Sequence, residues 1–127
     1  MVSLVLRRLA VALLLTLAPL AAQVTLKRGA VVYQGSGTNT TAPATVDESK
    51  LKEATPEWKK IQADGIDVDS AQGKQLIHKM NERIKEAVKS VAQSESRDLV
   101  TRKDDIIDKQ GKDVVDLTDK VVDKISE

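Results

Sequence analysis

The stretch SAQGKQLIHKMNERIKEAVKSVAQS, residues 70–94, decides the fold of this chain. Its apolar residues recur at alternating intervals of three and four: Ile77, Met80, Ile84, Ala87 and Val91. This spacing is typical of an apolar stripe along one face of an α-helix, with charged side chains on the opposite face. Leu76 and Val88 widen the stripe. A helix of this length is roughly 37 Å long and needs more than one short partner helix to cover it.

The segment immediately before this helix predicts the first partner. Four of its apolar residues are spaced by three, four and three: Leu51, Ala54, Trp58 and Ile61. Pro56 lies inside the segment, and proline is well tolerated only in the first turn of a helix. We therefore expect a helix that begins near Thr55, with Thr55 as its N-cap. A short helical turn at residues 46–54 would precede it.

Residues 63–69, ADGIDVD, connect the two predicted helices. They contain Gly65 and three aspartates, a composition that favours a tight turn. Asp69 is expected to cap the second helix, with Gln72 three residues later completing a capping box. Because the connection is short, we expect an antiparallel helical hairpin in which the two apolar stripes face each other.

Beyond Ser94 the period of the sequence changes from helical to extended. Three short β-type runs and a turn follow, at residues 98–101, 105–108 and 114–115, with the turn at 109–112. Thr118 is expected to cap a last helix. The buried side of that helix is predicted to consist of Val121, Val122 and Ile125. The chain is therefore predicted to have an α+β fold: a small β-sheet body, an antiparallel helical hairpin and a C-terminal helix.

The composition limits how such a fold can be stabilised. The chain has one Trp, one Tyr, no Phe and no Cys, so its core must be aliphatic and no disulfide can support it. A small domain buries a limited fraction of its surface, and we therefore expect self-association. The residues predicted to form the core or the contacts between subunits are Ile84, Val88, Val91, Leu99, Ile106, Val121 and Ile125.

The first 22 residues predict export. Arg7 and Arg8 precede the apolar run LAVALLLTLAPLAA at residues 9–22, which ends in the small residues Ala21 and Ala22. A basic start, a short apolar stretch and small residues before the cleavage point are typical of a secretory signal peptide. The run is shorter than the ~20 residues that a membrane-spanning helix needs. We predict cleavage near Ala22 and a periplasmic mature protein.

The residues after the signal peptide are predicted to be an extension of the main domain. Residues 23–33 favour a short strand, although no hairpin partner follows them. Residues 34–45, QGSGTNTTAPAT, have the composition of a flexible linker. Asn39 begins a formal glycosylation triplet, which arises easily by chance in a threonine-rich stretch. We therefore divide the mature chain into an N-terminal extension and linker at 23–43 and a domain at 44–127.

The sequence offers little for catalysis, and we expect no enzymatic activity, cofactor, metal or small-molecule substrate. The only histidine, His78, lies beside the apolar stripe among polar residues, and there is no nucleophilic cysteine or glycine-rich phosphate loop. The aspartates at 64, 67 and 69 do not match a calcium-binding loop, so turn and capping roles explain them better. The three at 104, 105 and 108 flank a predicted strand and have no partner for acid–base chemistry.

Charge argues against two further classes of partner. Removing residues 1–22 takes two arginines from the 20 basic residues and none from the 19 acidic ones, which leaves 18 against 19. A nucleic-acid-binding protein would need a strongly basic face. We therefore expect neither nucleic-acid binding nor association with a membrane surface.

Two long segments resemble the Skp/OmpH family of periplasmic chaperones: RIKEAVKSVAQSESRDLV at 83–100 and KDVVDLTDKVVDKI at 112–125. The family pattern is a long helix ending in an A-V-x-x-V-A type run, a D-L-V strand, and a final helix introduced by D-[IL]-T. Residues 98–100 and 116–118 occupy the last two places of that pattern. A weaker similarity covers residues 44–62. The resemblance thus spans nearly all of the predicted domain.

This resemblance implies a homotrimeric chaperone that holds unfolded outer-membrane or other exported proteins without ATP. In the family, long helical hairpins project from a β-body and enclose the client. Here only about seven residues separate the helices and the first helix is short, so we expect a shallow and weak grip. The client contacts would lie on the inner side of the hairpin, at Trp58, Ile61, Ile66, Leu76 and Met80.

The sequence is compatible with two alternative interpretations. Ile61, Leu76 and Met80 are explained at least as well by packing of the two helices against each other, whereas Ile66 sits in a turn with no evident packing role. The whole protein is also compatible with a non-catalytic structural or adaptor module of the cell envelope that binds no unfolded client.

We predict that the exported protein begins at Gln23, because the three-part organisation of residues 1–22 fits removal by a signal peptidase. Amino-terminal sequencing of the protein recovered from the producing cells would measure this. Retention of Met1 together with membrane association would contradict the prediction.

Overall fold

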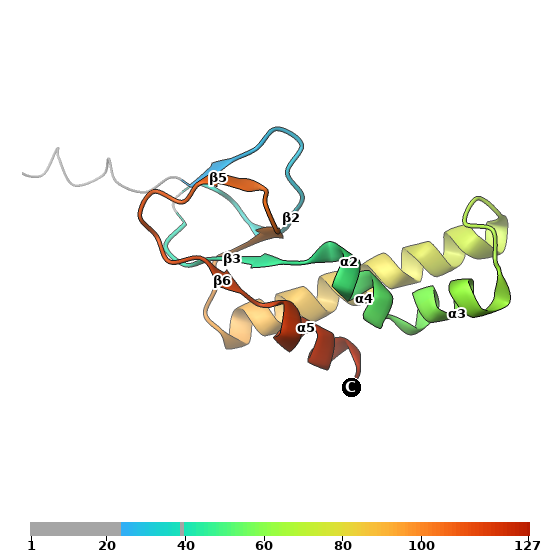
Figure 1. Ribbon diagram of the computed structural model, residues 1–127. Coiled ribbons are helices and arrows are strands. Elements are labelled where there is room, and N and C mark those ends of the chain that lie inside the picture. The colour runs from blue at the N-terminus through green and yellow to red at the C-terminus, as the bar shows by residue number, and fades with distance from the viewer. Residues whose placement is uncertain (1–23, 39) are drawn as a thin grey trace, which may run out of the picture.

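The computed structural model describes residues 24–38 and 40–127 (Figure 1). The predicted signal peptide and Asn39 lie outside the described residues. In chain order the elements are β1 (Thr25–Leu26), β2 (Val32–Gly35), β3 (Pro43–Val46), α2 (Glu48–Ala54), α3 (Pro56–Asp64), α4 (Ala71–Ser94), β4 (Leu99–Arg102), β5 (Ile106–Asp108), β6 (Val115–Asp116) and α5 (Thr118–Ile125). Helices together with small sheets confirm the predicted α+β fold.

Strand β4 lies inside a four-stranded sheet with the order β2-β4-β3-β6. It pairs antiparallel with β2 and parallel with β3, and β3 pairs parallel with β6. Leu99, Val100 and Thr101 are fully buried, as expected for a strand covered on both faces. Strands β1 and β5 form a separate antiparallel pair, which Figure 1 shows on the side of the larger sheet opposite to α4.

The prediction of a flexible linker over residues 34–45 is wrong at both of its ends. Gln34 and Gly35 belong to β2, and β3 begins at Pro43. Proline is accepted here because it is the first residue of its strand. The pairing of β1 with β5 and of β2 with β4 was not predicted, because each partner strand lies more than sixty residues further along the chain.

The helical hairpin forms largely as the sequence predicts. Thr55 caps α3, since its hydroxyl oxygen accepts a hydrogen bond from the Trp58 N–H at 3.2 Å. The cap of α4 was predicted wrongly: Ser70, not Asp69, accepts the Gly73 N–H, at 3.0 Å. Asp69 instead donates its own N–H to the Asp67 carboxylate at 2.9 Å, within the turn that precedes the helix.

The start of α5 also differs from the prediction. Thr118 is its first helical residue and does not cap it. The Asp116 carboxylate accepts the Thr118 N–H at 2.9 Å, and the Thr118 hydroxyl oxygen accepts the Asp47 N–H at the same distance. Thr118 is buried, and its bond to Asp47 ties the beginning of α5 to the end of β3.

The core lies between the four-stranded sheet and the helices α2, α4 and α5. It contains the buried part of the α4 stripe together with residues from β3, β4 and α5: Ala44, Val46, Leu51, Met80, Ile84, Ala87, Val88, Val91, Ala92, Val100, Leu117, Val121 and Ile125. Of the seven residues predicted for the core or the subunit contacts, the structure buries Ile84, Val88, Val91, Leu99, Val121 and Ile125. Ile106 on β5 is half-buried.

We predict that Ile84→Asp unfolds the protein, because it places an unpaired charge in the core at a side chain that is 5% exposed. The expected cost, about 4 kcal/mol or more, is comparable with the stability of a small domain. Lys85→Asp is the control, since it puts the same residue on the next, exposed position of the same helix. Urea unfolding followed by circular dichroism measures both, and equal stabilities would contradict the packing of α4.

Candidate functional site

The candidate site is the arm formed by α3 and the first half of α4, which extends away from the sheets (Figure 1). An ion pair fixes the root of this arm. Arg83 donates from Nε to both carboxylate oxygens of Glu57, at 3.1 and 3.0 Å, and from its terminal nitrogen at 2.9 Å. Burial raises the pKa of Glu57, but the hydrogen bonds from Arg83 outweigh that effect and hold it below its usual value. Glu57 therefore stays ionised and locks α3 onto α4.

The structure separates the five predicted client contacts into two groups. Ile61 and Met80 are only 3% and 5% exposed, so they pack the two helices together or face the core. Trp58, Ile66 and Leu76 are half-buried and keep part of their surface accessible. Lys52 lies over the Trp58 ring, with its ammonium group 3.9 Å from the ring centre, which favours this ring position.

The tip of the arm adds an apolar residue that sequence analysis missed. Val68 is 42% exposed, beside the half-buried Ile66. The tip loop lies in close contact with α4. A Cβ atom at Gly73 would lie only 2.0 Å from the Asp67 carbonyl oxygen. Only glycine fits there, so the loop holds Ile66 and Val68 in fixed positions. The signal in the sequence was two apolar residues alternating with aspartates inside a turn.

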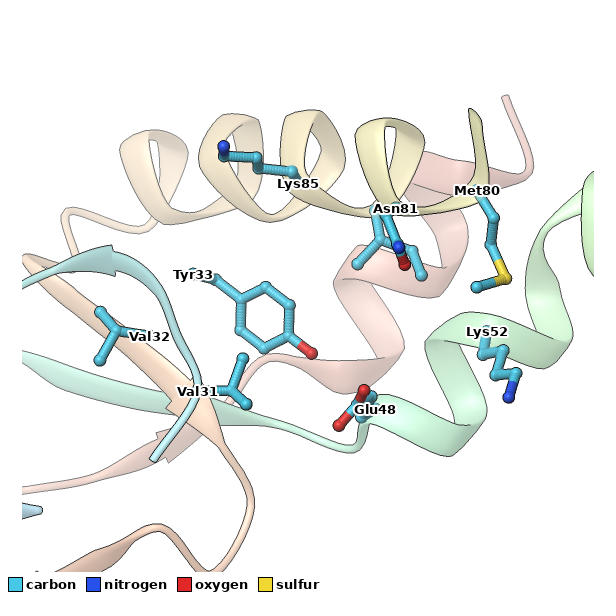
Figure 2. Close-up of a pocket in the computed structure, with 9 residues that line it drawn as sticks. Val31, Val32, Tyr33, Glu48, Lys52, Met80, Asn81 and Lys85 are labelled. Carbon is cyan, nitrogen blue, oxygen red and sulfur yellow. The ribbon is translucent and has the colours of Figure 1, made fainter. Parts of the chain in front are cut away.

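A cavity of about 250 Å³ opens at the root of the arm, between β2, α2 and α4. Figure 2 shows the Tyr33 ring lying between β2 and α4, with Asn81 and Met80 reaching into the same space from the helix. The remaining walls come from Val31, Val32, Glu48, Lys52, Ile84 and Lys85. Burial, and then the nearby Glu48 charge, raise the pKa of Tyr33 to about 12. Sequence analysis missed this cavity because the strand that supplies Tyr33 was not paired correctly.

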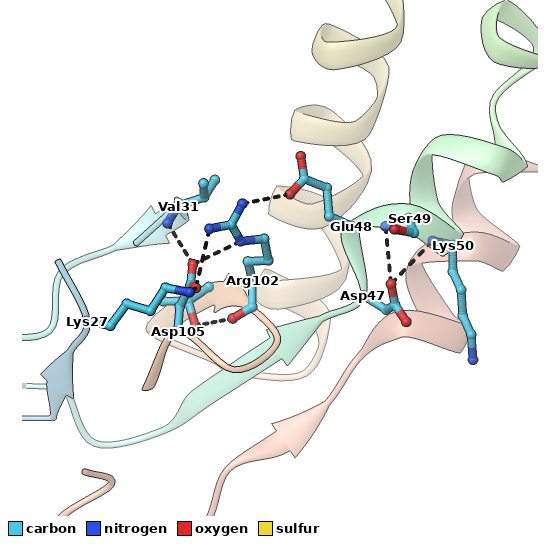
Figure 3. Close-up of polar contacts among 9 residues, drawn as sticks. Lys27, Val31, Asp47, Glu48, Ser49, Lys50, Arg102 and Asp105 are labelled. Carbon is cyan, nitrogen blue, oxygen red and sulfur yellow. Dashed lines mark hydrogen bonds and ion pairs between the residues drawn. The ribbon is translucent and has the colours of Figure 1, made fainter. Parts of the chain in front are cut away.

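A buried carboxylate holds the N-terminal segment on the body (Figure 3). Asp105 is fully buried and accepts hydrogen bonds from the Val31 N–H at 2.8 Å and from Arg102 Nε at 3.2 Å. Lys27 Nζ lies 3.4 Å from it, and Arg102 also reaches Glu48 at 3.3 Å. Burial raises the pKa of Asp105, but the Val31, Arg102 and Lys27 donors outweigh it and hold it below its usual range. Asp105 thereby ties the segment around Lys27 and Val31 to the end of β4.

A second carboxylate clamps the end of the same segment. Asp98 accepts the Thr41 N–H at 2.7 Å and the Ala42 N–H at 3.0 Å. It also accepts the hydroxyl groups of Thr40 and Thr41. Burial raises the pKa of Asp98, but these hydrogen bonds outweigh it and hold it well below its usual value. Side-chain acceptors thus fix residues 40–42, whose composition alone predicted a linker.

Other classes of site find little support within residues 24–38 and 40–127. His78 is exposed on α4, and the described part of the chain contains no group of three His, Cys, Asp or Glu side chains arranged to hold a metal ion. None of the described helices is long and apolar enough to cross a membrane.

Comparisons of the chain with models of known protein families, with curated proteins and with solved structures found no match.

We predict that Asp105→Asn destabilises the protein by about 1–3 kcal/mol, because the neutral amide weakens the hydrogen bonds to the Val31 N–H and Arg102. Asp104→Asn is the matched control. Asp104 is exposed and has a φ of 70°, a conformation that asparagine tolerates, so this variant should be as stable as the parent. Urea denaturation at pH 7 measures both, and similar stabilities of the two variants would contradict the clamp.

The same carboxylate predicts how stability depends on pH. The pKa of Asp105 is lower in the folded protein than in the unfolded chain, where it is about 3.9. Its contribution is therefore present above that unfolded value and is lost as the pH falls through the folded pKa. We expect the parent to lose stability more steeply than Asp105→Asn when denaturation is repeated below about pH 4, and parallel curves would contradict this assignment.

Proposed function

We propose that this protein is an ATP-independent holdase of the periplasm that binds unfolded exported or outer-membrane proteins and works as a homotrimer. The observation that carries the proposal is the helical arm, which holds apolar residues in fixed, partly accessible positions. At its tip, Ile66 is half-buried and Val68 is exposed. Nearer the body, Trp58 keeps part of its ring accessible.

The sequence supports the same proposal independently of the arm. The segments that resemble Skp/OmpH chaperones, at residues 83–100 and 112–125, form the second half of α4 with β4, and β6 with α5. These elements make up much of the body from which the arm extends (Figure 1). The predicted signal peptide supports a periplasmic location.

The mechanism we propose is binding at equilibrium. The sequence has no nucleotide-binding loop to drive a cycle, so the chaperone would keep client chains apart only while they are bound. Tryptophan offers a large apolar surface and tolerates varied partners. The arm is short, since α3 has nine residues, and each copy therefore encloses few client residues. We expect the affinity of one arm for an unfolded chain to be low.

One observation favours an alternative function, a structural or adaptor module of the cell envelope. Ile61 and Met80 are buried, so two of the five predicted contacts are used to hold the fold together. An adaptor would bind one folded partner in a fixed ratio, whereas a holdase would bind many unfolded chains weakly.

We predict that the mature protein suppresses aggregation of an unfolded β-barrel protein diluted from urea, measured by light scattering. The double variant Ile66→Ser/Val68→Ser should suppress it several-fold less well, because the tip loses its accessible apolar surface. Ile107→Ser is the control, since Ile107 is 68% exposed but lies on β5 in the body.

Two results of this assay would overturn parts of the proposal. Undiminished aggregation at a several-fold excess of trimer would refute the holdase function and favour the adaptor. Equal activity of the parent and the tip variant would show that the arm tip is not the contact surface. Sedimentation equilibrium of the same samples gives the oligomeric state, and a stable folded monomer at micromolar concentration would contradict the homotrimer.

A further inference from the structure

The edge of the larger sheet and the cavity at the root of the arm lie next to each other. Strand β2 is the last strand in the order β2-β4-β3-β6, and no strand of the described residues pairs with its outer edge. An unpaired edge can accept an extended peptide as an additional strand. The sequence of β2, Val-Tyr-Gln-Gly, carries no charged residue, so it lacks the lysines that commonly protect such edges.

The cavity supplies a place for one side chain of a strand added there. Val31 and the β2 residues Val32 and Tyr33 form one wall, and Met80, Asn81 and Ile84 of α4 form another (Figure 2). A cavity of roughly 150 Å³ with aliphatic walls is large enough to bind benzene. The cavity here measures about 250 Å³, which is enough for an aromatic ring or a branched aliphatic side chain.

The charge at the rim restricts the sequence of the occupant. Lys85 lines the cavity and forms no ion pair with the described residues. Glu48 lies on the other side, but its carboxylate is already paired with Arg102 at 3.3 Å. The rim therefore offers an unpaired positive charge, which favours an acidic residue close to the apolar side chain that is inserted.

We propose that β2 and this cavity together bind an extended client segment as a fifth strand. One aromatic or branched side chain of the segment enters the cavity, and a neighbouring acidic residue pairs with Lys85. The inference rests on the proposed holdase function, since it specifies which part of an unfolded chain is held. It adds a second contact surface on the body, separate from the arm tip.

The experiment uses the mature protein and the peptide Thr-Val-Thr-Phe-Ser-Asp with both ends blocked. Binding is measured by calorimetry and by the fluorescence of Trp58, the only tryptophan, which contacts Lys52 at the cavity wall. Two matched peptides separate the two parts of the site. In one, serine replaces the phenylalanine. In the other, backbone N-methylation removes the N–H donors that a strand needs and keeps every side chain.

The protein variants fill the cavity or leave it unchanged. Asn81→Phe places a ring at the cavity wall and should weaken binding of the parent peptide at least tenfold. Glu82→Phe makes the same type of substitution at the next, exposed position of α4, which does not line the cavity, and should bind normally. Lys85→Gln should weaken binding of the parent peptide a few-fold, because its aspartate loses the ion pair with Lys85, and Lys89→Gln is the control.

Each outcome decides the proposal. Loss of binding with both matched peptides and with Asn81→Phe supports it. Equal binding of the N-methylated peptide, or normal binding by Asn81→Phe, overturns it. If the parent protein binds no peptide and Asn81→Phe changes the oligomeric state in sedimentation, the site is an interface between copies and the proposal fails. Suppression of client aggregation without peptide binding would refute this inference alone, whereas peptide binding without suppression would refute the holdase function alone.

Discussion

Burial of one continuous apolar stripe on α4 holds the arm and the body together. The stripe runs from Met80, beside α3, through Ile84 and Val88 to Val91 and Ala92, near the sheet and α5. Each of the methionine, isoleucine and valine side chains in this stripe contributes about 1.5–3 kcal/mol when it is fully buried. Because a single helix carries the whole stripe, the arm cannot shift without disturbing the core of the body.

Two carboxylates perform a different task at the N-terminal segment, residues 24–42. Asp98 holds residues 40–42 and Asp105 holds Val31 and Lys27. Both aspartates flank β4, one immediately before it and one three residues after its end. Strand β2 pairs with β4 between these two clamps. Hydrogen bonds to ionised acceptors thus add to the burial of Val24 and Tyr33 in ordering this part of the chain.

The sequence reveals those parts of the fold that depend on neighbouring residues. The period of residues 70–94 predicts α4, and the pair Thr55–Pro56 predicts the start of α3, because caps and stripes are local signals. The pairing of β1 with β5 and of β2 with β4 joins residues that are distant along the chain, and no local pattern predicts it. For the same reason, Ile66 could be proposed as a contact residue because it lies in a local turn. The cavity beside Tyr33 could not be predicted, because it depends on strand pairing between distant residues.

The placement of the apolar surfaces also bears on how a holdase with so short an arm, as proposed, would bind a client. Val68 at the tip and the cavity beside Tyr33 lie at opposite ends of the arm, connected by α4. A client chain long enough to reach both would bind the second site at a high effective concentration after binding the first. In the proposed homotrimer, three copies multiply these weak contacts. Under the proposed function, enclosure by a deep cage is then unnecessary, because affinity would arise from several shallow sites that a flexible chain contacts at the same time.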